Sequence, residues 1–330
     1  MKELINIGII GAGKFSHQHV KAIREIDTFK LVAACRREEK ELAQYCAHYG
    51  IKGYVNYQEL LNDKTIDAVL IATPHHHHTT VAIEAARAGK HILLEKPFAP
   101  TLAECEQINN EAKAAGILLM LGHTTQFTAA FQATKALLDK EELGPLVQAV
   151  SFSNTLWMGP DRKKWHLSKE FGGGYLLTLG VHSISAMLSM VESPVASVRC
   201  TLGTRFHPFN TDDYGTLWMN FSNGVVATII YTGYTKGVLK VESEFYCEKG
   251  MIKANVREGA FIAENDQWRL VPHSQSGNWL HEALVNEWKE FSSSIIDKRR
   301  PLVDGDEAIK SMQVIDAAFR SSVENREIWL

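Results

Sequence analysis

The feature that most constrains this chain lies at its start, where an apolar run over residues 4–10 leads into two glycines and a helix-like segment. The run shows no helical spacing of its apolar residues, which is typical of a parallel strand buried on both faces. Gly11 permits a sharp reversal after the strand, and Gly13 lets the backbone approach a pyrophosphate. The helix that follows would offer unpaired N–H groups and the positive end of its dipole to the phosphates. The stretch therefore predicts a dinucleotide-binding turn.

This fingerprint is incomplete, because Ser16 stands where the third glycine of G-x-G-x-x-G is expected. Serine is small enough for close packing of the helix, so it stays among the expected cofactor contacts, together with Lys14 and Phe15. The alternative is a glycine turn in an α/β domain that binds no nucleotide. The elements that follow favour the cofactor site.

The bulk properties of the chain point to a small-molecule partner. Its 330 residues exceed the usual size of a single core, so two domains are expected, and 45% apolar residues supply ample core. The net charge of -3, with no long Lys/Arg run, gives no electrostatic reason to expect nucleic acid or a membrane as partner.

Five scattered cysteines, without C-x-x-C spacing, indicate neither a disulfide framework nor a zinc knuckle and fit a reducing cytosol. The N-terminus lacks a signal-peptide pattern, and no apolar run is long enough to span a bilayer. We expect a soluble, cytoplasmic protein.

Short apolar strands alternate with helical segments over residues 1–122. Further strands are expected at 31–35, 67–72, 91–94 and 118–121, with helices between them. This alternation predicts an α/β fold that begins with a Rossmann domain, a doubly wound parallel sheet whose ligand crevice lies outside the carboxyl ends of the strands. Thr73 and Pro74, which follow one of these strands, should border the cofactor.

A dinucleotide domain reads the adenosine ribose at the end of its second strand, where this chain has Arg36 and Arg37. An Asp or Glu there accepts from the ribose hydroxyls of NAD, whereas an arginine pairs with the 2′-phosphate of NADP. The pair therefore favours NADP over NAD. In the alternative, both arginines are solvated residues at the start of the next helix.

Four consecutive histidines occupy positions 75–78. Adjacent side chains on a loop point in divergent directions, and no carboxylate or cysteine cluster lies nearby in the sequence, so no metal site is predicted. We expect a loop that leads into a helix over 79–88, with His75 and His78 lining the cofactor crevice.

Glu95, Lys96 and Pro97 follow the strand at 91–94. A lysine at the carboxyl end of a parallel strand, beside an acid and before a rigid proline, is well placed to project into the crevice. Next to a nicotinamide, its ammonium would donate to a substrate hydroxyl oxygen and favour the alkoxide. Taken alone, a surface Lys–Glu pair fits the sequence equally well.

Four motifs occur in the order and spacing of one protein family: Gly11-Ala12-Gly13; Thr73-Pro74 with His78 four positions on; Ala88-Gly89-Lys90-His91; and Glu95-Lys96-Pro97. The chain therefore resembles the Gfo/Idh/MocA oxidoreductases, and later segments extend the resemblance to nearly its whole length. In this family the second domain commonly forms a subunit interface with the outer face of its sheet. The resemblance implies a homo-oligomer, a dimer or a tetramer.

Residues 123–330 are rich in strands, which are expected at 147–152, 197–202, 214–221, 225–232 and 241–246. Turns at 222–224 and 249–250 join neighbouring strands as hairpins, so an α+β domain with a large open, mostly antiparallel sheet is predicted. Long helices over 279–296 and 306–324 would close this domain.

Candidate substrate contacts begin at His123, which precedes a segment that is often rich in Arg and Phe in the family but here reads Thr124-Thr125-Gln126-Phe127. The loop over 157–166 is dense in aromatic and ionisable groups, and Trp faces beside polar donors suit a sugar ring. Its candidates are Trp157, Arg162, Trp165 and His166. The alternative is an ordinary surface loop with a Trp packed inward.

A glycine run at 172–174 opens a helix that carries Tyr175, Thr178 and His182 as further candidates. Thr178 and His182 stand four residues apart and should share one helical face. The segment resembles one in which an Asp, a His four residues later and often a further Asp line the active site, but Thr178 and Ser185 replace the acids. Threonine supplies no charge to raise the basicity of the imidazole. Without the resemblance, His182 could be a buried core residue whose ring nitrogens are hydrogen-bonded.

The main hypothesis is an NAD(P)-dependent oxidoreductase that interconverts a secondary alcohol and a ketone on a sugar, cyclitol or related polyol by hydride transfer. His182 would exchange the hydroxyl proton, Lys96 would stabilise the oxyanion, and Thr178 would position substrate or imidazole. Two alternatives stay open: a regulatory or sensor protein that keeps the dinucleotide fold without the chemistry, and a dihydrodiol-type dehydrogenase.

Overall fold

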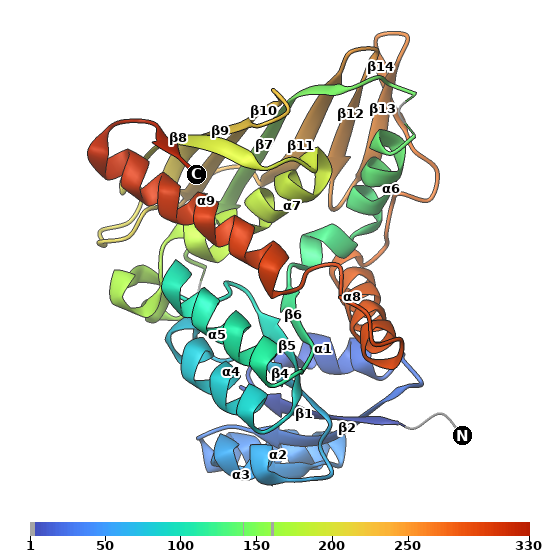
Figure 1. The fold of residues 1–330 in the computed structure, drawn as a ribbon, viewed down its shortest axis with the longest axis vertical. Coiled ribbons are helices and arrows are strands. Elements are labelled where there is room, and N and C mark those ends of the chain that lie inside the picture. Colours follow the sequence, from blue (N-terminus) through green and yellow to red (C-terminus); the bar gives the residue numbers. More distant parts are fainter. Residues whose placement is uncertain (1–3, 141, 160–161) are drawn as a thin grey trace. The chain divides into compact units, whose positions relative to one another are not determined.

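The computed structural model describes residues 4–140, 142–159 and 162–330. Contacts within the chain divide it into two compact units (Figure 1). The first comprises Met1–His123 and Leu284–Ile309, and the second comprises Thr124–Ala283 and Lys310–Leu330. The sequence pattern places the division after residue 122 and assigns residues 284–309 to the second domain, whereas here they belong to the first unit.

The first unit is built on a six-stranded parallel sheet with the strand order β3-β2-β1-β4-β5-β6. The order reverses between β1 and β4, and ligands of doubly wound sheets bind at such a reversal. The predicted Rossmann fold is confirmed. The strands are β1 (Ile5–Ile10), β2 (Phe29–Cys35), β3 (Lys52–Tyr54), β4 (Ala68–Ile71), β5 (His91–Glu95) and β6 (Leu119–Gly122).

The register of this sheet aligns the carboxyl ends of its strands. Ile10 pairs with Cys35 on one side and with Ile71 on the other, and Glu95 pairs with Gly122. The segments that follow β1, β2, β4, β5 and β6 therefore emerge at one edge of the sheet, which is where the predicted cofactor residues lie.

Helices connect these strands, as the alternation predicts, and α4 and α5 lie side by side (Figure 1). Helix α5 begins with a capping box, in which the Thr101 hydroxyl accepts from the Glu104 N–H and the Glu104 carboxylate accepts from the Thr101 N–H. The helical segments are α1 (Ser16–Ile23), α2 (Glu39–Tyr49), α3 (Tyr57–Asn62), the 3₁₀ turn η1 (His75–His77), α4 (His78–Arg87) and α5 (Leu102–Ala114).

The returning segment comprises most of α8 (Trp279–Ile296), the chain that follows it and the first turn of α9 (Gly305–Glu324). Trp288 and Phe291 of α8 are fully buried and pack against Phe29 at the start of β2. Beyond α8, the Leu121 N–H donates to the Val303 carbonyl at 2.9 Å, so the segment also satisfies the edge strand β6.

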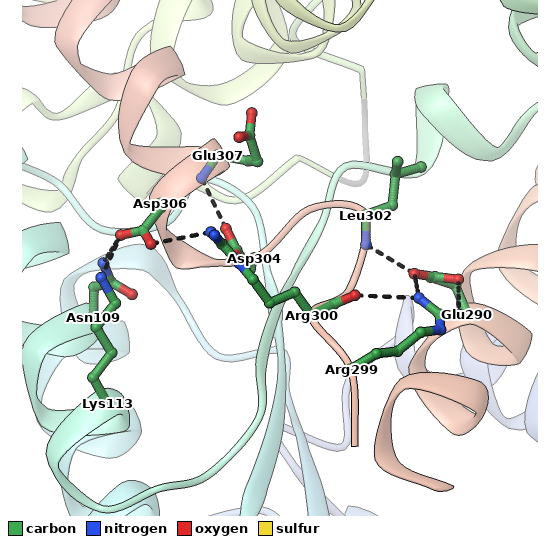
Figure 2. Close-up of polar contacts among 9 residues, drawn as sticks. All are labelled: Asn109, Lys113, Glu290, Arg299, Arg300, Leu302, Asp304, Asp306 and Glu307. Atoms are coloured by element: carbon green, nitrogen blue, oxygen red, sulfur yellow. Dashed lines mark hydrogen bonds and ion pairs between the residues drawn. The ribbon is translucent and has the colours of Figure 1, made fainter. Parts of the chain in front are cut away.

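Figure 2 shows the polar contacts that hold this segment. Arg299 donates to both carboxylate oxygens of Glu290 at 2.7 Å, which fixes the chain just after α8. Asp306 accepts from Asn109 at 2.8 Å and from Lys113 at 2.6 Å, which fixes the start of α9 against α5. Residues 284–309 are thus integral to the first unit.

The second unit contains a nine-stranded sheet with the order β14-β13-β12-β11-β7-β10-β9-β8-β15. All neighbouring strands are antiparallel except β7 and β10, which confirms a mostly antiparallel sheet. The strands are β7 (Leu146–Leu156), β8 (Val195–Gly203), β9 (Tyr214–Phe221), β10 (Val226–Tyr234), β11 (Lys240–Cys247), β12 (Gly250–Asn255), β13 (Gly259–Glu264), β14 (Gln267–Leu270) and β15 (Ile328–Trp329).

Helices cover one face of this sheet (Figure 1). Helix α6 (Ala129–Leu138) packs on β12 and β13, and α7 (Val181–Val191) packs on β7 and β10. Strand β9 shows the resulting alternation, because Leu217 and Met219 are buried whereas Trp218 is 50% exposed. The other face is therefore left with exposed apolar side chains.

By length and composition alone, one helical stretch in the described part of the chain, Lys169–Val191, could cross a membrane. However, 78% of its most apolar window is buried inside the protein. A core helix of this kind passes the same test, so the stretch is weak evidence for a membrane span.

Candidate functional site

The glycine turn between β1 and α1 has the geometry that a dinucleotide requires. Gly11 has a φ of +98°, and a Cβ there would lie 2.5 Å from the Ala72 carbonyl oxygen, so only glycine fits. A Cβ on Gly13 would meet nothing nearer than 3.9 Å, which leaves open space just before α1. Ser16 is buried, and its hydroxyl lies 2.7 Å from Gly13 O and 2.9 Å from Tyr45 Oη. Serine therefore fills the third-glycine position with its polar group satisfied.

Arg36 and Arg37 follow β2 beside this turn. The Arg36 guanidinium donates to Ala12 O at 3.1 Å and to Glu38 Oε2 at 3.0 Å. Arg37 Nη2 lies 2.9 Å from His77 Nε2. Because a guanidinium only donates, His77 must accept here, and burial lowers the pKa of His77 in the direction that this neutral form requires.

His78 joins the loops that follow β4 and β5. Its Nε2 lies 2.9 Å from Thr73 O and its Nδ1 lies 2.9 Å from Pro97 O, and the ring is fully buried. Carbonyl oxygens only accept, so both contacts favour protonated ring nitrogens, whereas burial lowers the pKa of His78. The His75 ring packs against it with the centroids 5.7 Å apart. These histidines therefore hold the loops that carry Thr73 and Pro97.

Glu95 and Lys96 lie at the end of β5, on the same edge of the sheet. Glu95 is 7% exposed, and its Oε1 accepts from His19 Nε2 at 2.9 Å. Burial raises the pKa of a carboxyl, but the His19 hydrogen bond and the Lys96 charge outweigh it and hold the pKa of Glu95 below its usual value. Lys96 therefore follows an ionised carboxylate.

His123 is buried at the end of β6. Burial first, and the Lys96 charge second, lower the pKa of His123 to about 4, so its ring is neutral at physiological pH. Two buried polar atoms at this edge, His123 Nδ1 and Thr73 Oγ1, have no hydrogen-bond partner among the described residues. Unpaired buried polar atoms are costly, and a ligand can supply the partners. Together with the open space at Gly13, they fit a bound dinucleotide.

One group of ligand-type side chains in the first unit has the spacing of a metal site. Atoms of His19, Glu95 and Glu287 lie within 4.8 Å of one another. However, Trp288 Nε1 donates to His19 Nδ1 at 3.0 Å, and Nε2 of the same ring contacts Glu95. Both ring nitrogens of His19 are therefore engaged in hydrogen bonds, which leaves neither lone pair for a metal ion, so this group of side chains does not fit a metal site.

In the second unit, α7 presents His182 to the short helix η2 (Thr124–Phe127). Thr125 Oγ1 lies 3.4 Å from His182 Nδ1, and Gln126 Nε2 donates to Ser185 Oγ at 2.6 Å. Gln126 lies in the segment that lacks the usual arginine, and Ser185 replaces an acid. Gln126 and Ser185, which both differ from the family pattern, thus contact each other as a neutral pair.

The stretch that was expected as one α-helix begins with a π-helical turn, Leu176–Gly180, before α7. The Val181 N–H donates to Leu176 O, five residues back. Thr178 is 1% exposed, and its hydroxyl donates to Gly174 O at 2.6 Å. The proton of the Thr178 hydroxyl is therefore donated to the backbone, and Thr125 supplies a side-chain contact to His182.

Two aromatic residues that the sequence suggests as substrate contacts, Trp157 and Tyr175, are buried inside the second unit. Trp157 is 1% exposed, and its ring centroid lies 5.6 Å from that of His207. Tyr175 is fully buried and stacks on Tyr231 with the centroids 5.1 Å apart. Neither presents a ring face to solvent, because both side chains are buried.

The remaining loop candidates lie closer to the surface. The rings of Trp165 and His166 stack with their centroids 3.7 Å apart, and neither residue is buried. Arg162 is half-buried, and its N–H donates to Gly159 O at 3.0 Å. Pro160 and Asp161 of this loop lie outside the described residues.

Asp212 is a buried acid that the sequence analysis did not single out. Its Oδ2 accepts from the Leu176 N–H at 2.7 Å and from the Tyr231 hydroxyl at 3.0 Å, so it caps the π-helical turn. Burial raises the pKa of Asp212 to about 6. The sequence feature that could have pointed to Asp212 is the acidic pair Asp212-Asp213, which directly precedes the strand predicted at 214–221.

The structure thus gathers one set of predicted residues at the carboxyl edge of the parallel sheet and a second set around α7. The second set comprises His182, Thr178 and the nearby polar residues of η2. The first set comprises Gly11, Gly13, Lys14, Phe15, Ser16, Arg36, Arg37, Thr73, Pro74, His75, His78, Glu95, Lys96 and His123.

Two family models match the chain. One, described as an oxidoreductase family with an NAD-binding Rossmann fold, matches residues 5–123. The other, the GFO/IDH/MocA C-terminal domain, matches residues 131–253. Together the two ranges cover more than two thirds of the 330 residues.

Two characterised relatives and one solved structure resemble the chain. A 1-carboxy-3-chloro-3,4-dihydroxycyclohexa-1,5-diene dehydrogenase from Comamonas testosteroni is 29% identical over 70% of this chain and 58% of that protein. The 1,5-anhydro-D-fructose reductase of Ensifer adhaerens is 27% identical over 92% of each chain. Levoglucosan dehydrogenase, solved with NADH and levoglucosan, is 21% identical and superposes with a TM-score of 0.92 over 99% of each chain. The last comparison shows that the fold is shared.

Proposed function

Because the chain belongs to the Gfo/Idh/MocA oxidoreductase family, we propose that it is an NAD(P)-dependent dehydrogenase or reductase that interconverts a secondary alcohol and a ketone on a sugar, cyclitol or related polyol. The observation that carries this proposal is the position of Lys96. It follows β5 at the same sheet edge as the glycine turn after β1, with only β4 between these strands. The phosphate-binding and charge-bearing motifs are therefore near neighbours.

The bound nicotinamide would supply or accept the hydride. The open space at Gly13 and the N-terminus of α1 would hold the pyrophosphate, and Thr73 Oγ1 and His123 Nδ1 would gain partners from the ligand. Arg36 supports a preference for NADP. It follows β2, where a dinucleotide domain contacts the adenosine ribose, and Glu38 is already paired with its guanidinium.

Lys96 and His182 would share the acid–base work. The Lys96 ammonium would stabilise the oxyanion that develops as the C–O bond changes order. His182 would take or give the hydroxyl proton, with the Thr125 hydroxyl in contact with its Nδ1. This partner is a neutral hydroxyl, so Thr125 itself supplies no charge that would raise the basicity of the imidazole.

A second candidate is oxidation of a cyclic dihydrodiol. The Comamonas testosteroni relative is a dehydrogenase of a dihydroxycyclohexadiene, which motivates this candidate. Its substrate also carries a CH–OH group, so Lys96 and His182 would have the same roles in this reaction.

The outer face of the large sheet supports a homo-oligomer, a dimer or a tetramer, and the five scattered cysteines support a location in the reducing cytoplasm. Trp218 and Met251 on this sheet are 50% and 36% exposed. Exposed apolar side chains on one sheet face favour burial against another copy. The net charge of -3 offers no attraction for nucleic acid or an anionic membrane.

A turnover assay tests the proposed function. The purified full-length protein is mixed with each nicotinamide cofactor and with a panel of polyols, ketoses and cyclic dihydrodiols, and the reduced nicotinamide is followed by absorbance. Turnover on polyols or ketoses supports the first proposal, and turnover on dihydrodiols alone supports the second. A regulatory protein of the same fold would bind cofactor and turn over none of them.

A further inference from the structure

Three side chains from three elements form one hydrogen-bonded series inside the first unit. Trp288 on α8 donates from Nε1 to His19 Nδ1 at 3.0 Å, and His19 on α1 contacts Glu95 Oε1 through Nε2 at 2.9 Å. Trp288 and His19 are fully buried, and Glu95 is nearly so. Phe29 and Phe291 hold the indole edge-on, with centroids 5.3 and 5.6 Å from it.

The chemistry of tryptophan fixes the direction of both bonds. An indole N–H only donates, so His19 Nδ1 must present its lone pair to Trp288. In the neutral ring, the proton then sits on Nε2 and is donated to the Glu95 carboxylate. The reverse tautomer would set two N–H groups against each other in a dry environment, which is costly.

Several titratable side chains surround the Glu95 carboxylate that accepts this hydrogen bond. Lys96 follows it in the chain, and His78 on α4 and His123 at the end of β6 interact with it electrostatically. Glu287 on α8 is a second buried acidic side chain, with an oxygen within 4.8 Å of the Glu95 carboxylate. Burial disfavours the ionised form of Glu95. The hydrogen bond that His19 donates to Glu95 offsets this effect of burial.

We propose that Trp288 and His19 are positioning residues that fix the Glu95 carboxylate as an anion, in one orientation, beside Lys96. This inference rests on the proposed function, in which Lys96 stabilises the oxyanion. An anion beside the lysine favours the charged ammonium that this role requires. Helix α8 thereby supports the chemistry at the end of β5, although it occurs late in the sequence.

The first test reads the tautomer of His19 in the full-length protein. Nitrogen NMR of isotope-labelled histidine, with the His19 signals assigned by their loss in His19→Gln, should show a proton on Nε2 and a lone pair on Nδ1. Trp288→Phe keeps a ring between Phe29 and Phe291 but removes the donor, so it should release a mixture of tautomers. A proton on Nδ1 in the wild type, or an unchanged tautomer in Trp288→Phe, would overturn the proposal.

Two variants of His19 form a matched pair. A Gln amide nitrogen reaches the position of Nε2 and can still donate to Glu95, whereas an Asn amide reaches only the position of Nδ1. Carbon NMR of carboxyl-labelled glutamate, assigned with Glu95→Gln, should show the pKa of Glu95 about one to two units higher in His19→Asn than in His19→Gln. Equal pKa values in the two variants would overturn the proposal.

The pH profile of kcat connects this charge to the reaction. In His19→Asn the acidic limb should move to higher pH by as much as the pKa of Glu95 rises, while His19→Gln keeps the limb of the wild type. A uniform fall in kcat without this displacement would make the pair merely structural and overturn its positioning role. Absence of turnover in the wild type would contradict the proposed function instead, and the NMR results would still decide whether the pair holds the charge of Glu95.

Discussion

Neighbouring groups, more than residue type, set the charges at the end of the parallel sheet. Glu95 is almost fully buried, yet its pKa stays below the usual value because His19 donates to it and Lys96 adds a positive charge. His123 is buried too, but there burial and the Lys96 charge act in the same direction and lower the pKa to about 4. Lys96 is thus the cationic member of this cluster, which suits the stabilisation of an oxyanion.

Replacing Lys96 by alanine should lower kcat by about 100- to 1000-fold, because it removes a donor to the developing oxyanion. The affinity for cofactor, measured by calorimetry, should change little. Lys30→Ala, on an exposed position of β2, is the control and should turn over like the wild type. Near-normal turnover in Lys96→Ala would remove this lysine from the mechanism.

Replacing Arg36 by glutamine should weaken NADPH binding by about 10- to 100-fold, the worth of one charge-assisted hydrogen bond, and leave NADH binding nearly unchanged. The wild-type preference should also shrink as salt is added, since ions screen the contact with the 2′-phosphate. Calorimetric titrations at matched salt measure both effects. Equal losses for the two cofactors would mean that Arg36 supports only the fold of the turn, through its bond to Ala12 O.

Asp212 gives a pH-dependent test of stability. Burial raises its pKa from 3.8 to about 6, so the folded protein holds a proton that the unfolded chain has released between these values. Stability from this group is therefore complete below about pH 4 and is lost as the pH rises through about 6, at roughly 1.4 kcal/mol for each pH unit in between. Denaturant unfolding at several pH values should show wild type losing stability relative to Asp212→Asn over this range. A difference that does not vary with pH would contradict the raised pKa.

At the scale of elements, the two glycines of the first turn have different tasks. Gly11 is required by the fold, because a Cβ would collide with the Ala72 carbonyl and the residue has positive φ. Gly13 faces open space, so its lack of a side chain serves what binds there.

Gly11→Ala should therefore destabilise the protein by about 1–3 kcal/mol or more through backbone strain. Gly13→Ala should unfold at nearly the wild-type temperature and yet lose cofactor affinity, because its methyl group occupies the space for the pyrophosphate. Thermal unfolding and calorimetry of both variants separate the two tasks. Normal cofactor binding in Gly13→Ala would place the phosphates elsewhere.

Elements with a local signal could be predicted from the sequence, and those set by distant contacts could not. The apolar run before Gly11 and the bounds of α8 needed only local pattern and matched the structure. The π-helical turn at Leu176–Gly180 depends on a cap from Asp212, which lies far along the chain, so its periodicity looked α-helical. The contact between Gln126 and Ser185 could not be predicted either, because these residues also lie far apart in the sequence.

At the scale of the whole molecule, the division of the chain was only partly visible in the sequence. Residues 284–309 carry no composition shift that marks them as part of the first unit. Their return depends on contacts such as Asp306 with Asn109 and Lys113, which join positions nearly two hundred residues apart. The His19–Trp288 bond, with its consequence for Glu95, was invisible for the same reason.

The outer face of the large sheet predicts an oligomer. Light scattering should give a mass that is a multiple of 36.9 kDa, and Trp218→Glu should lower it by placing a charge in the interface. Val238→Glu, at an apolar position that is 86% exposed, is the control and should keep the wild-type mass. A monomeric wild type would mean that this face is covered in some other way.

Transfer of deuterium tests the central claim most directly. A polyol that the protein accepts is labelled with deuterium at its carbinol carbon and incubated with the full-length protein and oxidised cofactor, and the products are analysed by mass spectrometry. The account predicts that the label appears in the reduced nicotinamide in equal amount to the ketone formed, and that Lys96→Ala slows its appearance without preventing cofactor binding. Bound cofactor that never acquires deuterium from any labelled polyol would contradict the account and favour a regulatory protein of the same fold.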